Sequence, residues 1–337
     1  MKITRWLIVG CGRIFFGRML PVLRARADSK IVGLVDSAED ALQKAREQGV
    51  QTARRFSRLE QALDWGEFDA AYVATPTAEH VAAVKRLLQN DYHVLCEKPL
   101  AGRAQIAEQL RELADRGPAI CMVAYMSKFN AYNEEAIQQV KDGRIGRIRR
   151  MDSRFSFTAS GDCTWRLRAG SGGGVLNDIG IYPLTTFRDV MGRPPRSVRA
   201  MIFPDPEPHA VDESVRAQLW YDDDVEATVF SSFRAPAAAA LDLWGEDGTI
   251  SVTSTFGQTG TGHIAVGYEL KKGTRVPVQE HNPYDREVAY FQNCIRTGEK
   301  PDARFSVHGA LMDLRVMDAI RAAAESGHEV RLSASPS

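Results

Sequence analysis

The sequence predicts an α/β protein of two domains: a doubly wound parallel sheet, followed by an α+β domain built on an open antiparallel sheet. Its 337 residues are too many for one ordinary core. In the first third, continuous apolar strands alternate with amphipathic helices, as in a parallel sheet covered on both faces. After about residue 125 the strands follow one another through short turns, which indicates antiparallel pairing. We place the domains at residues 1–124 and 125–337 and expect that the late helices can pack back on the first domain.

The elements of the first domain follow from short apolar runs and from the helical periodicity between them. Five runs predict strands: Trp6–Val9, Ile31–Val35, Ala70–Ala74, His93–Cys96 and Ile120–Ala124. Four stretches between them predict helices: Met19–Arg26, Ala38–Gln48, Glu79–Leu88 and Ala104–Arg116. The connections between parallel strands should be right-handed.

The second domain shows a different order. Alternating patterns predict strands at residues 151–157, 197–203, 214–221, 225–233, 240–245 and 249–254. Helical patterns predict a first helix at Glu134–Lys141, one from about Ile179 to Met191, and two late helices at Asp285–Arg296 and Val307–Glu325.

Composition excludes several classes of protein. Lys plus Arg and Asp plus Glu both number 43, so no basic surplus predicts binding to nucleic acid or to an anionic membrane surface. No apolar run reaches the eighteen residues that a membrane span needs. The five cysteines are scattered and never in CxxC spacing, which argues against a disulfide framework and a zinc site: Cys11, Cys96, Cys121, Cys163 and Cys294. We expect no metal and a reducing, cytoplasmic location.

A glycine turn ends the first strand. In Gly10-Cys11-Gly12-Arg13-Ile14, the first glycine can make a tight turn and the second can let the backbone approach a pyrophosphate at a helix N-terminus. The second strand ends in Asp36, where a carboxylate can accept the ribose hydroxyls of NAD and repel a 2′-phosphate. We therefore expect a Rossmann-type site for NAD, with NADP as the alternative cofactor.

Two further segments follow strands of the same sheet. Thr75, Pro76 and His80 come after the third predicted strand, and Glu97-Lys98-Pro99 after the fourth. Open α/β sheets place ligands at this edge. A lysine there can donate or accept a proton.

Taken together, these motifs resemble the Gfo/Idh/MocA oxidoreductase family. The resemblance rests on GCGRI, the Asp36 strand end, DAAYVATPTAEH, HVLCEKPL and WRLRAGSGGGVLNDIGIYPL, in that order along nearly the whole chain. The last segment is most similar to the glucose–fructose oxidoreductase and dihydrodiol dehydrogenase branches. Those branches carry tyrosine where inositol dehydrogenase-like members usually carry histidine, and Tyr182 stands there.

The resemblance implies a role for each matching residue. Cofactor contacts would come from Gly10, Gly12, Arg13 and Ile14 at the pyrophosphate, Asp36 at the adenosine ribose, Thr75, Pro76 and His80 in the cleft, and Glu97 and Lys98 at the nicotinamide ribose. Lys98, Tyr182 and Asp178 would be catalytic, with Asp178 and Tyr182 also contacting the substrate. The chain departs from the family pattern at Phe15, which takes the third glycine position, and at Thr77, where Asn is frequent. We expect either a displaced helix or a Phe15 ring turned away from the sheet.

The chemistry that the resemblance implies is hydride transfer with a matched proton transfer. When a secondary alcohol loses hydride to a nicotinamide, a base must take the hydroxyl proton. Tyrosine alone is a poor base, because its free pKa is about 10. A neighbouring lysine ammonium favours the phenolate, so we expect Lys98 and Tyr182 to act together.

Other polar residues are candidates for substrate contacts. Arg166 precedes the glycine run of the second domain, and Lys128 and Asn130 follow the last strand of the first. The structural alternatives are a solvated loop arginine for Arg166, a helix N-cap for Asp178, a core tyrosine for Tyr182 and a loop-holding role for His80.

The predicted function is NAD(P)-dependent oxidation or reduction of a secondary alcohol or ketone on a sugar, a sugar derivative or a cyclic polyol. Two alternatives remain: an NAD-dependent glycoside hydrolase, and a non-catalytic regulator that senses the cofactor. The second-domain strands carry apolar residues on both faces, for example Leu219 and Tyr221 on one and Trp220 on the other. We therefore expect a homodimer or homotetramer formed through this sheet.

Overall fold

A computed structural model describes residues 2–159, 166–204, 211–256, 262–267 and 273–332. The chain divides into two compact units, residues 1–125 with 284–311 and residues 126–283 with 312–337. Within the part of the chain that is described, no helix is both long enough and apolar enough to span a membrane.

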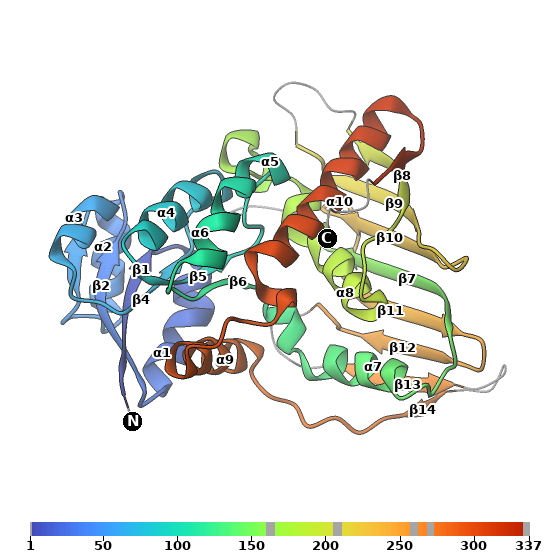
Figure 1. The fold of residues 1–337 in the computed structure, drawn as a ribbon, viewed down its shortest axis with the longest axis horizontal. Helices are drawn as coiled ribbons and strands as arrows, with labels where there is room; N and C mark the ends of the chain where they lie inside the picture. Colours follow the sequence, from blue (N-terminus) through green and yellow to red (C-terminus); the bar gives the residue numbers. More distant parts are fainter. Residues whose placement is uncertain (1, 160–165, 205–210, 257–261, 268–272, 333–337) are drawn as a thin grey trace. The chain divides into compact units, whose positions relative to one another are not determined.

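The first unit is built on a six-stranded parallel sheet (Figure 1). The strand order is β3-β2-β1-β4-β5-β6, the order of a doubly wound dinucleotide-binding sheet. Its strands are β1 (Thr4–Val9), β2 (Ser29–Val35), β3 (Arg54–Phe56), β4 (Ala70–Val73), β5 (His93–Glu97) and β6 (Cys121–Ala124). The chain order reverses direction across the sheet between β1 and β4, which is where such sheets bind their ligands.

Helices connect these strands. They are a π-helical turn at Phe15–Met19 that leads into α1 (Leu20–Ala25), then α2 (Glu39–Glu47), α3 (Leu59–Trp65), α4 (Thr77–Gln89), α5 (Ala104–Ala107), a 3₁₀ turn at Glu108–Leu110 and α6 (Arg111–Arg116). Helix α9 (Pro283–Thr297) belongs to this unit from Tyr284 onward, and a 3₁₀ turn at Ala303–Phe305 follows it. The five predicted strands are confirmed. Strand β3 and helix α3 were not predicted, and the predicted single helix at residues 104–116 is divided into α5, a 3₁₀ turn and α6.

The second unit holds a nine-stranded sheet of order β14-β13-β12-β11-β7-β10-β9-β8-β15 (Figure 1). Its strands are β7 (Ile148–Ser156), β8 (Ser197–Phe203), β9 (Ser214–Trp220), β10 (Glu226–Ser232), β11 (Ala238–Gly245), β12 (Thr249–Thr253), β13 (His263–Gly267), β14 (Thr274–Arg275) and β15 (Val330–Arg331). The expected open antiparallel sheet is confirmed, with one departure: β10 pairs with β7 in parallel. Strand β10 also pairs with β9, in the antiparallel sense, so the sheet is mixed and mostly antiparallel.

Two helices cover one face of this sheet. Helix α7 (Ala131–Lys141) packs on β12 and β13, and α8 (Ile181–Met191) packs on β7 and β10. A 3₁₀ turn at Met126–Phe129 precedes α7, another lies at Ala169–Ser171, and a π-helical turn at Leu176–Gly180 precedes α8. Helix α10 (Val307–Ser326) begins in the first unit and continues in the second from Met312 onward.

Candidate active site

The glycine turn after β1 lies at the reversal point of the first sheet. Gly10 has φ +96°, and a Cβ there would lie 2.6 Å from the carbonyl carbon of Ala74 after β4. Only glycine fits this conformation and this approach of two backbones. Gly12 differs, because a Cβ on it would meet no atom of the described residues within 4 Å, apart from its own chain neighbours. The packing of the chain therefore requires Gly10, whereas the space at Gly12 is available to a ligand.

Asp36 ties the end of β2 to this turn. One carboxylate oxygen accepts the Cys11 backbone N–H at 2.8 Å, and the other accepts that of Ala38 at 2.8 Å. These bonds hold the carboxylate beside the turn. Its charge therefore stands at the place where the resemblance puts the adenosine ribose.

The Phe15 side chain, at the third glycine position of the family pattern, fits into the structure through a local change in the helix. Its side chain is fully buried, and its ring centroid lies 5.1 Å from that of Phe16. The helix starts as a π-helical turn over Phe15–Met19 and becomes α-helical only at Leu20. Because a π turn is wider than an α turn, it leaves room for a ring where the family pattern has glycine.

A groove of about 590 Å³ lies beside the glycine turn, between it and α2. Two cationic side chains line it, Arg13 from the turn and Lys44 from α2, together with Asp40. Lys44 also stacks its ammonium on the Phe16 ring, 4.8 Å from the centroid. Positive charge beside a helix N-terminus suits the binding of phosphates.

His80 joins two loops at the carboxyl edge of the sheet. Its Nδ1 lies 2.9 Å from the Pro99 carbonyl oxygen, and its Nε2 lies 2.9 Å from that of Thr75. The side chain is buried, and burial lowers its pKa despite these two carbonyls. A neutral imidazole can donate to one of them at a time. His80 therefore has the loop-holding role and brings Thr75 close to the Glu97-Lys98-Pro99 segment.

Glu97 and Lys98 are half-buried at the end of β5. The Tyr72 hydroxyl donates to Glu97 Oε1 at 2.5 Å. Burial, with the Glu97 charge, raises the pKa of Tyr72 well above its usual value, so the hydroxyl keeps its proton and donates it. A fixed carboxylate thus precedes Lys98 in the sequence.

Two observations show that this edge fits a dinucleotide. The space beside Gly12 is open to a ligand. Among the residues described, no group hydrogen-bonds the buried Thr75 hydroxyl. A buried polar group without a partner is uncommon, so it points to a ligand that supplies one.

In the second unit, Asp178 lies in the π-helical turn that precedes α8. It is nearly buried and forms an ion pair with Arg166, 2.5 Å from Nε to Oδ2. Its backbone N–H donates to the Gly174 carbonyl. The N-caps of this turn and of α8 are Val175 and Gly180, so Asp178 stands at neither N-cap position. The helix-cap alternative for Asp178 was therefore wrong. The solvated-loop alternative for Arg166 was also wrong, because this guanidinium is mostly covered and paired.

Tyr182 stands in the first turn of α8. Its carbonyl accepts the hydroxyls of Thr185 and Thr186, each at 3.0 Å. Its ring lies among aromatic side chains, 5.8 Å from Phe155 and 6.4 Å from Phe256 between centroids. These contacts fix the backbone and the ring of Tyr182.

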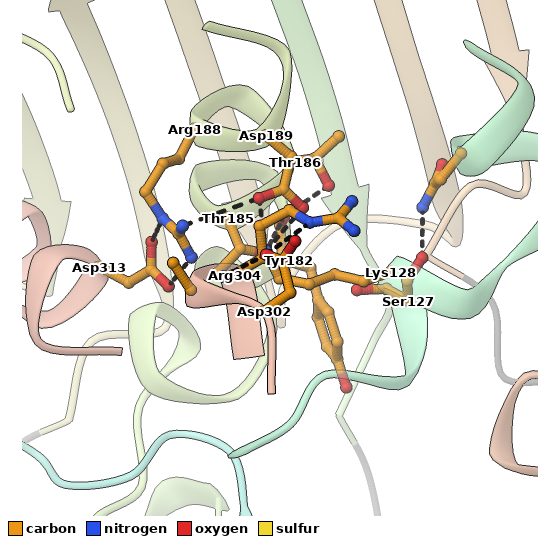
Figure 2. A network of polar contacts seen from close by, with 12 residues as sticks. Ser127, Lys128, Tyr182, Thr185, Thr186, Arg188, Asp189, Asp302, Arg304 and Asp313 are labelled. Carbon is orange, nitrogen blue, oxygen red and sulfur yellow. Dashed lines mark hydrogen bonds and ion pairs between the residues drawn. The ribbon is translucent and has the colours of Figure 1, made fainter. Parts of the chain in front are cut away.

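Lys128 and Asn130 both have partners within the second unit. Lys128 Nζ binds both carboxylate oxygens of Asp189 on α8, at 2.6 and 2.8 Å, and both side chains are about 2% exposed (Figure 2). Burial lowers the pKa of Lys128, against the attraction of Asp189. Asn130 is the N-cap of α7, where its Oδ1 accepts the backbone N–H groups of Tyr132 and Asn133. These contacts give both residues structural roles, and their substrate contacts stay a prediction.

Sequence reasoning missed three buried charged residues. Arg188 on α8 binds Asp313 on α10 through two bonds of 2.7 and 2.9 Å (Figure 2). Glu287 on α9 is fully buried. A sequence signal for Glu287 exists, because its spacing from Tyr284 and Phe291 places it on the apolar stripe of α9.

None of the described residues forms a group of three or more metal-ligating side chains.

Comparison with known proteins agrees with this geometry. Residues 4–125 match the model of an oxidoreductase family with an NAD-binding Rossmann fold, and residues 134–251 match the GFO/IDH/MocA C-terminal domain. The chain is 29% identical to a D-xylose 1-dehydrogenase [NADP(+)] of Haloarcula marismortui, over 98% of this chain and 93% of that protein. It is 27% identical to a dTDP-3,4-didehydro-2,6-dideoxy-α-D-glucose 3-reductase of Saccharopolyspora spinosa, over 89% and 90%.

Solved structures show the same architecture. An aldose–aldose oxidoreductase from Caulobacter crescentus complexed with glycerol superposes with a TM-score of 0.88 at 26% identity, over 98% of this chain and all of that one. A 3-ketoreductase from Actinomadura kijaniata in complex with NADP and TDP-benzene shares the fold, with a TM-score of 0.86 at 22% identity over 96% and 98%. Both domains of the chain are thus matched in order. The chain belongs to the GFO/IDH/MocA family of NAD(P)-binding oxidoreductases.

Proposed function

We propose that this oxidoreductase interconverts a secondary alcohol and a ketone, or a lactol and a lactone, on a sugar or a sugar derivative. The observation that carries the proposal is similarity over nearly the whole chain to enzymes named for sugar substrates, a xylose dehydrogenase and an aldose–aldose oxidoreductase among them. Lys98 at the end of β5 supplies the proton-transferring group that such a reaction needs.

In this proposal each unit contributes part of the chemistry. The nicotinamide, when bound, supplies the hydride donor or acceptor. Lys98 and the Tyr182 phenol move the hydroxyl proton, with the lysine ammonium favouring the phenolate. The Asp178 carboxylate, held by Arg166, accepts a hydrogen bond from a substrate hydroxyl and fixes the orientation of the sugar.

A spectrophotometric screen of sugars and polyols with NAD and NADP tests the proposal. We expect the reduced nicotinamide to accumulate with at least one aldose or polyol. A glycoside hydrolase of this family would recycle its cofactor and release sugar without net reduction. A protein that binds the dinucleotide tightly and turns over none of these compounds would instead be a regulator.

The anchored Asp36 carboxylate predicts the cofactor preference. A 2′-phosphate beside a fixed carboxylate is repelled, so NAD should bind at least about tenfold more tightly than NADP, a difference of roughly 1.4 kcal/mol. Calorimetric titration of the purified protein with both dinucleotides measures this ratio. Tighter binding of NADP would show that Arg13 and Lys44, which line the groove beside the turn, outweigh Asp36.

A further inference from the structure

Glu97 is the last residue of β5, at the carboxyl edge of the first sheet. Side chains alternate along a strand, so Trp6 and Ile8 of β1 point to the same face. The register pairs Ile8 with Tyr72 and Tyr72 with Leu95, two residues before Glu97. These side chains therefore share a face, and the hydrogen bond from Tyr72 to Glu97 agrees with this.

Helix α9 covers that face. The Phe291 ring on α9 packs on Trp6, with the centroids 5.5 Å apart. At the start of the helix, Arg26 binds Asp285 at 2.8 Å, and farther along Gln292 donates to the Ser29 hydroxyl. These contacts fix the rotation of α9 on the sheet.

The fixed rotation buries a carboxyl group. Tyr284, Glu287, Val288 and Phe291 recur at intervals of three and four residues and form the buried stripe of α9. Glu287 is 0% exposed, and within the described part of the chain neither of its oxygens has a hydrogen-bond partner. An ionised carboxylate in that position would lack both water and a counter-ion, which is a costly arrangement.

The groups around Glu287 oppose its ionisation. Burial raises the pKa of Glu287 well above its usual value, and the negative charge of Glu97 raises it further. No lysine or arginine among the described residues offsets these effects. The other titratable groups in this cluster are the hydroxyls of Tyr72 and Tyr284, which carry no positive charge.

Glu97 is the better site for a negative charge. It is half-buried and accepts a hydroxyl hydrogen bond at 2.5 Å, whereas Glu287 has neither advantage. We propose that the buried Glu287 is the protonated member of a carboxyl pair with the half-buried Glu97, and that it acts through Glu97 as a positioning residue for Lys98.

The consequence for Lys98 rests on the proposed function. A carboxylate close to an ammonium makes the ammonium harder to deprotonate, and a second carboxylate adds to this effect. By holding a proton, Glu287 limits the pair to one negative charge. Because Lys98 directly follows Glu97 in the chain, it then exchanges its proton next to a pair with one negative charge instead of two.

The experiment combines infrared spectroscopy with pH profiles of turnover. The proteins are the parent, Glu287→Gln, Glu97→Gln and a control, Glu112→Gln, at an exposed position of α6. At pH 7 we expect the C=O stretch of a protonated carboxyl in the parent and the control, and its absence in Glu287→Gln. In Glu97→Gln the band should titrate at lower pH than in the parent, because the opposing charge has gone.

The turnover profiles test the second half of the proposal. Ionisation of Glu287 adds a negative charge beside Glu97. The C=O band of the protonated carboxyl disappears over the pH range of this ionisation. Over the same range, turnover by the parent should differ from turnover by Glu287→Gln. The control should follow the parent.

Each outcome decides one part. Absence of a Glu287-dependent band at pH 7 overturns the proposal, whether or not a substrate has been found. In a second outcome the infrared band is present, while the parent and Glu287→Gln have the same pH profile of turnover over the pH range in which Glu287 ionises. That result would show that Glu287 does not act on Lys98. A band in a protein that turns over no sugar leaves the protonated pair standing and overturns the proposed function.

Discussion

At the scale of single residues, the buried carboxyl of Glu287 should make stability depend on pH. Its pKa in the folded protein is raised above the unfolded value of about 4.3. Its contribution to the free energy of unfolding is therefore fully present below that pH and is lost as the pH rises toward the folded pKa. Glu287→Gln has no proton to lose, so it should gain stability relative to the parent between pH 5 and pH 8, by up to about 1.4 kcal/mol per pH unit.

Urea unfolding of both proteins across this pH range measures the effect, with Glu112→Gln as the exposed control. A stability difference that stays constant with pH would mean that Glu287 keeps the same charge in the folded and unfolded states.

Residues at strand ends were predictable because local sequence specifies them. Gly10, Asp36 and Glu97 each follow a short apolar run, and the carboxyl ends of parallel strands meet at one edge. The surroundings of Lys128 could not be predicted from local sequence, since its partner Asp189 lies 61 residues away in the chain. Nothing in the sequence near Lys128 reveals that ion pair, whereas its place after a strand predicts a substrate contact, which stays a prediction.

At the scale of elements, the pair of Lys128 and Asp189 joins the 3₁₀ turn before α7 to α8, the helix that carries Tyr182. Removing Lys128 takes away both short bonds to the buried Asp189 carboxylate and leaves it with the longer ion pair to Arg188, at 3.8 Å. Lys128→Met should therefore lower the free energy of unfolding by about 3–5 kcal/mol, and the double variant Lys128→Met/Asp189→Leu should recover much of that loss.

Chemical denaturation of the parent, Lys128→Met, Asp189→Leu and the double variant forms the double-mutant cycle that measures the coupling between Lys128 and Asp189. If Lys128→Met keeps the stability of the parent and loses only substrate affinity, the ion pair contributes little to stability and the predicted substrate contact is correct.

The prediction of elements succeeded where the apolar pattern was long. Strand β9 alternates buried and exposed residues over seven positions and was found, whereas β14 and β15 have two residues each. The parallel pairing of β10 with β7 was also missed. That pairing joins strands about 75 residues apart, which the short turns between neighbouring strands do not indicate.

At the scale of the whole molecule, the nine-stranded sheet predicts assembly. Its face opposite α7 and α8 carries Met201 and Phe203, which are 75% and 52% exposed, with Trp220 half-buried on the same side. Apolar side chains gathered on one exposed face are usually covered by a partner. We expect a homodimer or homotetramer by light scattering at micromolar concentration, and weaker association for Met201→Lys/Phe203→Lys. A monomeric mass for the parent would contradict this.

We propose above all that Lys98 transfers the proton in a nicotinamide-dependent reaction on a sugar. The direct test measures turnover and NAD affinity of Lys98→Met on a substrate found in the screen, beside Lys30→Met as a control at an exposed position of β2. We expect Lys98→Met to lose a factor of about 10² to 10⁴ in turnover, the usual effect of removing a positioned acid or base. NAD affinity should change much less, because we propose that the glycine turn and Asp36 supply most of the cofactor contacts. Near-parental turnover by Lys98→Met would contradict the account, because the proton would then leave by another route.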